Sequence, residues 1–291
     1  MSPFIELLRP KQWVKNVFVL LPVFFSHRLT DVAAVGAALL CAVAFSLAAS
    51  AVYCLNDVLD READARPPRK CRRPIASGRV SSAQGVALGV VCAAVAVAMV
   101  AVLLPAAVVA LVAAYLLVNA LYSLRLKHVA LVDVLTVAVF YVMRVQAGAW
   151  AAHVEASQWI VVMTYLLALF LVLGKRRDDV VLSVSAGSAT PLRRASAAYN
   201  ADFLNVALTL VATVTLVAYL MYTISPEVTA RFGTPYVYFT AVFVLAGILR
   251  YLQLAIVEQR TGSPTEVVLH DRFTQCCLLG WAITFGAIIY L

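Results

Sequence analysis

Four polar residues end one long apolar stretch of this sequence: Asn56, Asp57, Asp60 and Asp64. If a helix continues through them, the three carboxylates are spaced i, i+3 and i+7 and share one face. Carboxylates held this close repel one another unless a cation lies among them. Oxygen ligands at this spacing suit Mg²⁺, which proteins typically hold through one or two carboxylates and the phosphates of a substrate. The pattern therefore predicts a metal site made by Asp57, Asp60 and Asp64, with Asn56 beside it as a substrate ligand.

Basic residues follow these acids within the same polar stretch, 55–79, which holds seven of the 23 Lys and Arg residues of the chain. Arg69, Lys70 and Arg73 are the candidates for gripping phosphate, because Arg suits bidentate phosphate contacts and Lys acts as a point charge. Acids and bases together favour a clamp for a magnesium–diphosphate complex. A simpler interpretation also fits, in which the stretch is a solvated loop whose bases mark the cytoplasmic side of a membrane.

A second group of charges ends another apolar stretch, in the segment LGKRRDDV at 173–180. Arg176 and Arg177 are predicted phosphate ligands. Lys175 and Asp179 join Asp60 and Asp64 as candidate catalytic residues. Because both groups fall on the same predicted side of the membrane, we expect them to line one cavity.

Single polar residues elsewhere complete the set of candidate substrate ligands, namely Lys15, Tyr122, Lys127 and Arg144. Ionisable residues inside a membrane are functional candidates by default. Two of them have alternative roles: Lys15 would serve as an interfacial anchor, and Arg144 would pair with a neighbouring helix.

The composition indicates an integral membrane protein, because 63% of the 291 residues are hydrophobic, 13% are charged and the mean hydropathy is +0.91. A soluble domain is nearer 45–50% apolar and about 25% charged. Segments of roughly 20 apolar residues predict about nine transmembrane helices. We therefore expect a single all-α domain over 1–291, with its helices around a central cavity that opens to the cytoplasm. The predicted spans are 13–30, 32–55, 83–103, 105–124, 131–152, 157–174, 203–224, 235–257 and 274–291.

The basic residues fall mostly on one side of this topology. With the N-terminus inside, 19 of the 23 Lys and Arg lie in the inner segments, which predicts an inner (plasma) membrane protein whose site faces the cytoplasm. The net charge of +8 therefore needs no nucleic-acid partner. The six cysteines form no CxxC pair, which disfavours a zinc site. We expect no removable signal peptide, because no small-residue cleavage site follows the first apolar run.

The sequence resembles a known superfamily in NDVLDREAD, at 56–64, and in the following RRPIASG. These resemble the NDxxDxxxD motif and trailing R-P of the UbiA-type intramembrane prenyltransferases, and the likeness extends over essentially the whole chain. RPKQWVKN, KCRRPIASG, YSLRLKHVALVDV, LGKRRDDV and SPTEVVLHDR resemble its decaprenyl-phosphate phosphoribosyltransferase branch. The segment KRRDD stands where the ordinary superfamily pattern has a second, spaced DxxxD.

The resemblance implies a reaction. Enzymes of that branch transfer 5-phosphoribose from phosphoribosyl diphosphate to a polyprenyl phosphate, for the synthesis of arabinose donors of the cell envelope. The superfamily implies Mg²⁺ as the cofactor, held here by Asp57, Asp60 and Asp64. Membrane lipid would surround the isoprenoid tail. The branch also implies homo-oligomers, although no particular interface is indicated in the sequence.

Two other functions remain open on the sequence. A prenyltransferase of the same superfamily would use the lipid as diphosphate donor and an aromatic or other acceptor, with the same metal clamp. A transporter of anionic lipids would also explain the apolar spans and the basic face, but transporters often place polar sites near the bilayer midplane. A purely structural membrane subunit would not need repeated carboxylates.

Overall fold

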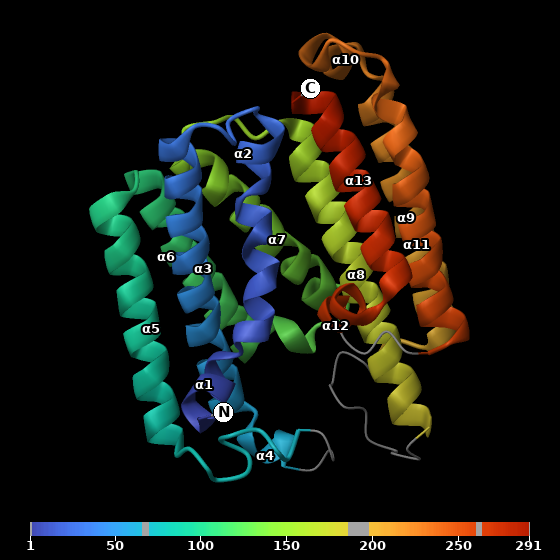
Figure 1. The fold of residues 1–291 in the computed structure, drawn as a ribbon. Coiled ribbons are helices and arrows are strands. Elements are labelled where there is room, and N and C mark those ends of the chain that lie inside the picture. The colour runs from blue at the N-terminus through green and yellow to red at the C-terminus, as the bar shows by residue number, and fades with distance from the viewer. Residues whose placement is uncertain (1, 66–69, 186–197, 260–263, 291) are drawn as a thin grey trace. The chain divides into compact units, whose positions relative to one another are not determined.

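The computed structural model describes residues 2–65, 70–185, 198–259 and 264–290, and every element within them is helical (Figure 1). This confirms the all-α prediction. The elements are α1 (Pro3–Leu8), η1 (Pro10–Val19), α2 (Leu21–Phe25), α3 (Val32–Leu59), α4 (Arg61–Asp64), α5 (Ser82–Leu103), α6 (Ala106–Leu124), η2 (Leu126–His128), α7 (Val132–Ala151), α8 (Gln158–Ser185), α9 (Ala201–Ile224), α10 (Pro226–Phe232), η4 (Tyr236–Thr240), α11 (Ala241–Leu252), η5 (Gln253–Val257), α12 (Pro264–His270) and α13 (Arg272–Tyr290).

The chain forms two compact units. The first unit comprises Met1–Lys127 and Val142–Ala156, and the second comprises His128–Tyr141 and Ser157–Leu291. Helix α7 contributes residues to both. The expectation of a single domain over the whole chain stays a prediction.

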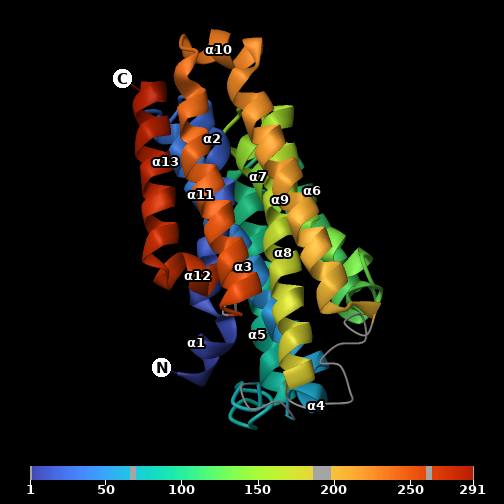
Figure 2. The same ribbon diagram turned by 90° about the vertical axis from the view of Figure 1, so that its right-hand side faces the viewer.

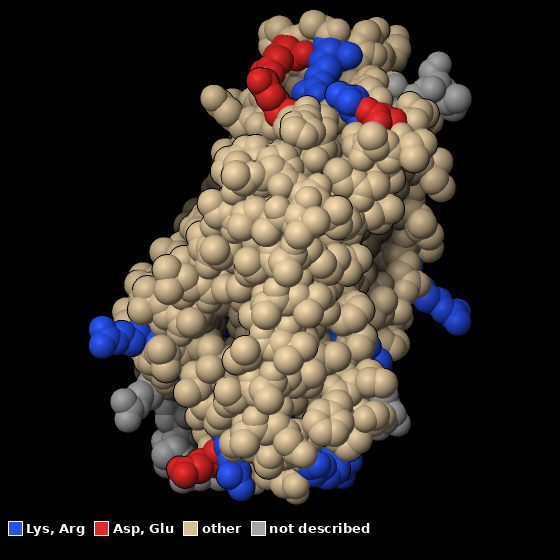
Figure 3. Space-filling model, turned by 90° about the vertical axis from the view of Figure 1, so that its left-hand side faces the viewer, with Lys and Arg blue, Asp and Glu red and all other residues tan. Residues whose placement is uncertain are grey.

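Seven helical segments within the described residues are long and apolar enough to cross a membrane. Most of the surface shown in Figure 3 carries neither acidic nor basic side chains. The chain is therefore an integral membrane protein. Nine crossings stay a prediction. The first and last expected spans hold η1, α2 and α13, and none of these is among the seven segments found in the described residues. The seven segments are Val32–Leu59, Ser82–Leu103, Ala106–Leu124, Val132–Ala151, Gln158–Leu182, Ala201–Ile224 and Tyr236–Val257.

The first expected span, 13–30, does not form one continuous α-helix. A 3₁₀-helix, η1, runs from Pro10 to Val19, and the short helix α2 begins at Leu21. Pro22 in the first turn of α2 has no backbone N–H to donate to the preceding turn. The expectation of an uninterrupted helix was therefore wrong, and the proline accounts for the break.

The sixth expected span also has different bounds. Helix α8 continues past Gly174 to Ser185, so the charged segment after Gly174 is helical and is not a loop. Gly174 lies directly against the ring of Tyr251, and a Cβ atom there would come within 3.0 Å of three ring and hydroxyl atoms. The glycine is therefore explained by close packing against Tyr251 rather than by the end of the helix.

The first unit is built on α3, whose buried face consists largely of small residues such as Ala38, Ala44 and Ala48. Small side chains let membrane helices approach closely, and α5 packs along α3. On another side of this unit, α7 approaches η1 so closely that a Cβ atom on Gly148 would collide with the carbonyl group of Val19. The position of η1, and hence of the N-terminal segment, depends on that glycine.

The second unit packs α8, α9, α11 and α13 side by side (Figure 2). Its apolar core includes Phe170, Leu204, Leu208 and Tyr251, all buried. Polar groups are buried in it too: Asp133 and Arg176 have exposed fractions of 0% and 3%. Because unpaired charges would be costly there, this unit must satisfy them internally.

Replacement of Gly148 by Ala should destabilise the first unit. The added methyl group meets the Val19 carbonyl, so backbone must move, and the free energy of unfolding should fall by about 1–3 kcal/mol. Gly36→Ala is the matched control, because nothing lies within 4 Å of a Cβ atom at Gly36 in α3. The thermal unfolding midpoint in detergent micelles measures both changes. Equal midpoints for the two variants would contradict the close packing.

Candidate functional site

The acidic motif lies where α3 ends. Asp57 occupies the last turn of α3, Asp60 is the C-cap residue, and Asp64 ends the one-turn helix α4. The backbone N–H of Asp60 donates to the carbonyl of Asn56 over 2.9 Å, and that of Asp64 donates to the carbonyl of Asp60 over 2.8 Å. The helix is therefore interrupted at Asp60 and does not run unbroken through the motif. The two backbone hydrogen bonds still keep a helical turn on each side of Asp60.

Arg73 joins two of these acids. Its Nη1 donates to Oδ1 of Asp57 over 3.3 Å and also to Oδ2 of Asp64. Since one nitrogen contacts both carboxylates, Asp57 and Asp64 lie on the same side, as their spacing predicts. The segment that carries Arg73 is fixed by Ile75, which is buried in an apolar cluster with Leu7.

Asp60 turns to a different partner. Its Oδ1 accepts a hydrogen bond of 2.6 Å from Nζ of Lys127, whose side chain is only 9% exposed. Lys127 lies in η2, far from the acids in sequence. The structure thus brings this predicted ligand to the acidic motif.

Arg9 is a member of this site that the sequence analysis missed. It donates to Oδ1 of Asp57, and its guanidinium carbon lies 4.9 Å from the centre of the Tyr53 ring. Arg9 connects α1 to η1 with a backbone φ of 52°, a left-handed conformation that residues other than glycine rarely adopt. Arg9 is the first residue of RPKQWVKN, the segment that marked this region by resemblance, but that resemblance did not indicate a partner for Arg9.

The donor set fits a hard divalent cation. Asp57 is 2% exposed, and its Oδ2 is buried without a hydrogen-bond partner, although Oδ1 accepts bonds from two arginines. A buried carboxylate oxygen that receives no donor is the group a metal would complete. In the described part of the chain, no three acidic, histidine or cysteine side chains already converge on one point. The carboxylates are held by bases instead.

The other predicted ligands of the first unit differ in how far they are buried. Asn56, Lys70 and Lys15 are half-buried, and Tyr122 is 9% exposed. Arg69 lies outside the described residues. Their roles toward a substrate stay predictions.

Arg144 is buried within the apolar length of α7. Its Nε donates to Oδ1 of Asn16 and its Nη2 donates to the hydroxyl of Tyr115, each over 2.8 Å. Asn16 in turn donates to Oγ of Ser46 over 2.7 Å. Arg144 therefore links α7 to η1, α6 and α3, which agrees with the alternative in which it pairs with neighbouring helices.

Arg176 takes part in a buried ion pair. Its Nε donates to Oδ2 of Asp133 over 2.6 Å, and its Nη1 lies 3.4 Å from Oδ2 of Asp179. The hydroxyl of Tyr199 donates to Oδ1 of Asp133 over 2.8 Å and accepts the N–H of Leu131 over 2.6 Å. Burial, with Asp133 adding to its effect, raises the pKa of Tyr199 to about 12, so the phenol remains a donor at neutral pH.

Arg177 is likewise engaged inside the second unit. Its Nε donates to Oδ1 of Asn205 over 2.6 Å, and its Nη1 donates to the backbone carbonyl of Ala255. Ala255 lies in the π-helical segment η5, where the α-helical bonding pattern is interrupted and carbonyls need other donors. Lys175 is half-buried. The predicted phosphate-binding role of these bases would require Arg176 and Arg177 to exchange internal partners.

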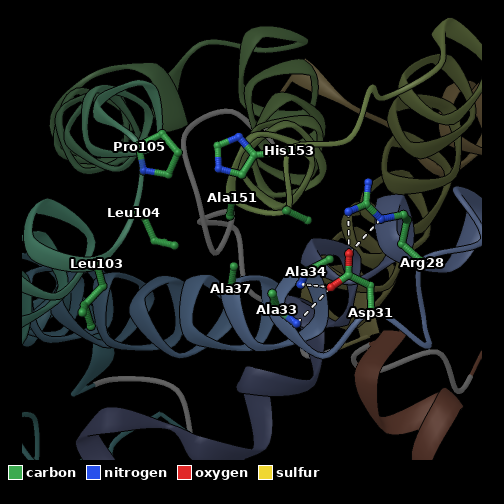
Figure 4. A pocket seen from close by; sticks show the side chains of 11 residues that line it. Arg28, Asp31, Ala33, Ala34, Ala37, Leu103, Leu104, Pro105, Ala151 and His153 are labelled. Atoms are coloured by element: carbon green, nitrogen blue, oxygen red, sulfur yellow. Dashed lines mark hydrogen bonds and ion pairs between the residues drawn. The ribbon is translucent and has the colours of Figure 1, made fainter.

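A cavity of about 280 Å³ lies at the opposite end of α3 from the acids, between the beginning of α3, the α5–α6 connection and the end of α7. Its wall is mostly alanine and leucine, and Figure 4 shows Arg28 paired with Asp31 at one side and His153 across from them. Arg28 and the backbone N–H groups that start α3 lower the pKa of Asp31. Because its arginine is already neutralised, this cavity offers no diphosphate site.

Comparison with known proteins identifies the family. The model of the UbiA prenyltransferase family matches residues 17–269. The chain belongs to the UbiA prenyltransferase family. It is therefore a membrane-embedded transferase. UbiA relatives include decaprenyl-phosphate phosphoribosyltransferases from Mycobacterium tuberculosis, 33% identical over 98% of this chain and 93% of that protein, and from Mycolicibacterium smegmatis, 34% identical over 99% and 93%.

A solved UbiA structure has the same fold. The UbiA homologue from Archaeoglobus fulgidus bound to GPP and Mg²⁺ aligns over 100% of both chains with a TM-score of 0.73 and 18% sequence identity. The resemblance found in the sequence is thus confirmed at the level of family and fold.

Replacement of Tyr199 by Phe should destabilise the second unit by about 1–3 kcal/mol, because Asp133 and the N–H of Leu131 each lose a buried partner. The raised pKa makes this stabilisation fully present below pH 10 and lost as the pH rises towards 12. Chemical unfolding of both proteins at several pH values measures the difference. Tyr236→Phe, at a tyrosine that is 58% exposed, is the control. A pH-independent difference, or equal losses in both variants, would contradict the assignment.

Proposed function

We propose that this protein transfers 5-phosphoribose from phosphoribosyl diphosphate to a polyprenyl phosphate. The observation that carries the proposal is the paired cluster of carboxylates and bases at the end of α3, in which Asp57 keeps one buried oxygen without a donor. Such a cluster suits a substrate that is a metal–diphosphate complex, because it offers carboxylates to the metal and cations to the phosphates.

The metal, which we propose to be Mg²⁺, would be held by Asp57, Asp60 and Asp64. When bound, it supplies charge neutralisation for the departing diphosphate. Oδ2 of Asp57 is the oxygen best prepared for it. The names of the mycobacterial relatives and the Mg²⁺-bound archaeal structure support this choice of chemistry.

The transfer itself needs little from the chain beyond positioning and positive charge. The bond between C1 of the ribose and the diphosphate oxygen breaks, and its electron pair leaves with the diphosphate. An oxygen of the lipid phosphate forms the new bond to C1. Arg73 and Lys127, which pair with Asp64 and Asp60, would stabilise charge on the leaving group. A phosphate monoester is already ionised, so no strong general base is required.

The setting of this reaction is also proposed. The polyprenyl chain would lie against the apolar spans, and both phosphates would meet at the cytoplasmic face of the inner membrane. The concentration of bases on one side of the predicted topology supports that orientation. The arrangement of the α8 bases toward the same substrate stays a prediction.

Product analysis tests the donor. Purified protein is incubated with phosphoribosyl diphosphate and polyprenyl phosphate, and separately with a prenyl diphosphate and an aromatic acceptor, each with Mg²⁺. Mass spectrometry should find a lipid-linked phosphoribose in the first reaction. A prenylated acceptor in the second reaction alone would replace the proposal by the prenyltransferase alternative. Movement of lipid across liposomes without any product would favour a transporter.

Replacement of Asp60 or Asp64 by Asn should lower the rate of phosphoribose transfer by about 100-fold or more, because several kcal/mol of charge stabilisation depend on the metal. Each variant should remain monodisperse in size-exclusion chromatography. Asp202→Asn is the control, since Asp202 is an exposed acid in the first turn of α9. Turnover near that of the unaltered protein in either motif variant would remove the metal role.

A further inference from the structure

The acidic motif is electrically balanced by bases from three separate places in the chain. Asp57 is paired with Arg9 and Arg73. Asp64 is paired with Arg73, and Asp60 with Lys127. Three negative and three positive charges leave the cluster neutral, although a site for bare cations would be expected to carry net negative charge. The balance is a property of the folded chain, because Arg9 and Lys127 are distant from the acids in sequence.

Arg9 is brought to this cluster by a docked N-terminal segment. Along α3, Ser46 and Ser50 hold that segment: Ser46 accepts from Asn16, and Ser50 accepts from Nε1 of Trp13 over 3.1 Å. Ser50 also donates to the carbonyl of Leu8 over 2.8 Å. These bonds lie on successive turns of α3 leading to Asp57. They fix the residues on both sides of Arg9, which explains how a left-handed backbone there is maintained.

Asp57 shows how the balance affects a metal. Its Oδ1 receives both Arg9 and Arg73, while Oδ2, buried in the same 2%-exposed side chain, receives no hydrogen bond. A divalent cation would reach Oδ2 with two guanidinium groups already opposite it. Repulsion between like charges is strong in such a poorly solvated place. A diphosphate that arrived with the metal would give those arginines a new partner.

We propose that Arg9, together with Arg73, acts as a built-in counter-ion that excludes a bare divalent cation and makes the metal bind as its diphosphate complex. The inference rests on the proposed metal–diphosphate chemistry of this site. Arg9 is a positioning residue of the acid cluster in the free protein. Binding of the complex lets the arginines move from Asp57 to phosphate oxygens, so the metal and the diphosphate strengthen each other's binding.

The test is metal binding by the full-length protein in lipid nanodiscs, measured by calorimetry with Mn²⁺ alone and with preformed Mn²⁺–pyrophosphate. The unaltered protein should bind the complex about tenfold or more tightly than the bare ion, which is the usual range of coupling between two ligands. Arg9→Gln should bind bare Mn²⁺ about tenfold more tightly and the complex more weakly. Arg9→Lys, which keeps the charge, should bind bare Mn²⁺ like the unaltered protein.

Two further variants keep the result interpretable. Arg79→Gln also removes one positive charge near the N-terminal segment, but Arg79 pairs with Glu6 at an exposed position, so its metal binding should not change. Arg73→Gln should also tighten the binding of bare Mn²⁺, as Arg9→Gln does. If loss of Arg9 undocks the N-terminal segment, Arg73→Gln still tests whether an arginine on Asp57 excludes the bare ion.

Either of two results would overturn the inference. The first is that Arg9→Gln and Arg73→Gln both bind bare Mn²⁺ no more tightly than the unaltered protein does. The second is that the unaltered protein binds the bare ion and the complex equally tightly. If the complex still binds and phosphoribose is still transferred, the proposed function stands without this device. If no protein binds the complex, the proposed metal chemistry fails as well.

Discussion

Pairing of buried carboxylates with arginine and lysine at the end of an apolar helix is the constraint on which the first unit depends. Asp57 is almost inaccessible to solvent, and an unpaired ionised carboxylate there would be costly. Breaking a buried pair by removal of one partner typically costs 3–5 kcal/mol. The fold therefore has to deliver bases to the acids, and the one carboxylate oxygen that it leaves without a donor is the prepared position for a metal.

Packing in the surrounding structure holds these bases near the acids. Small residues on α3 let α5 pack closely, and the apolar cluster around Ile75 holds the segment that carries Arg73. Gly148 lets α7 approach η1, and the serines of α3 hold the residues that flank Arg9. In the second unit the buried carboxylate of Asp133 is also paired. Both of its oxygens accept hydrogen bonds, one from Arg176 and one from Tyr199. The charged residues of α8 thus contribute to internal cohesion there.

Much of this could be predicted from the sequence, because apolar length, motif spacing and charge asymmetry are local signals. They predicted the helical class, the membrane location and the shared side of Asp57 and Asp64, and the resemblance of the quoted motifs predicted the family. The break at Pro22 and the continuation of α8 beyond Gly174 were missed, since the length of an apolar run shows neither an interruption at a proline inside it nor a helix that continues into charged residues. The partnership of Arg9 with Asp57 was also missed, because 48 residues separate them and only the docked N-terminal segment brings them together.

The central claim is that the acids at the end of α3 hold a divalent ion with its diphosphate. Anomalous diffraction from crystals grown with Mn²⁺ and pyrophosphate tests it most directly. The account predicts one strong peak at coordination distance, about 2.0–2.2 Å, from oxygens of the Asp57, Asp60 and Asp64 carboxylates, with Arg9 and Arg73 turned to the pyrophosphate. Bound pyrophosphate with its manganese at another place, and Arg9 still on Asp57, would contradict it.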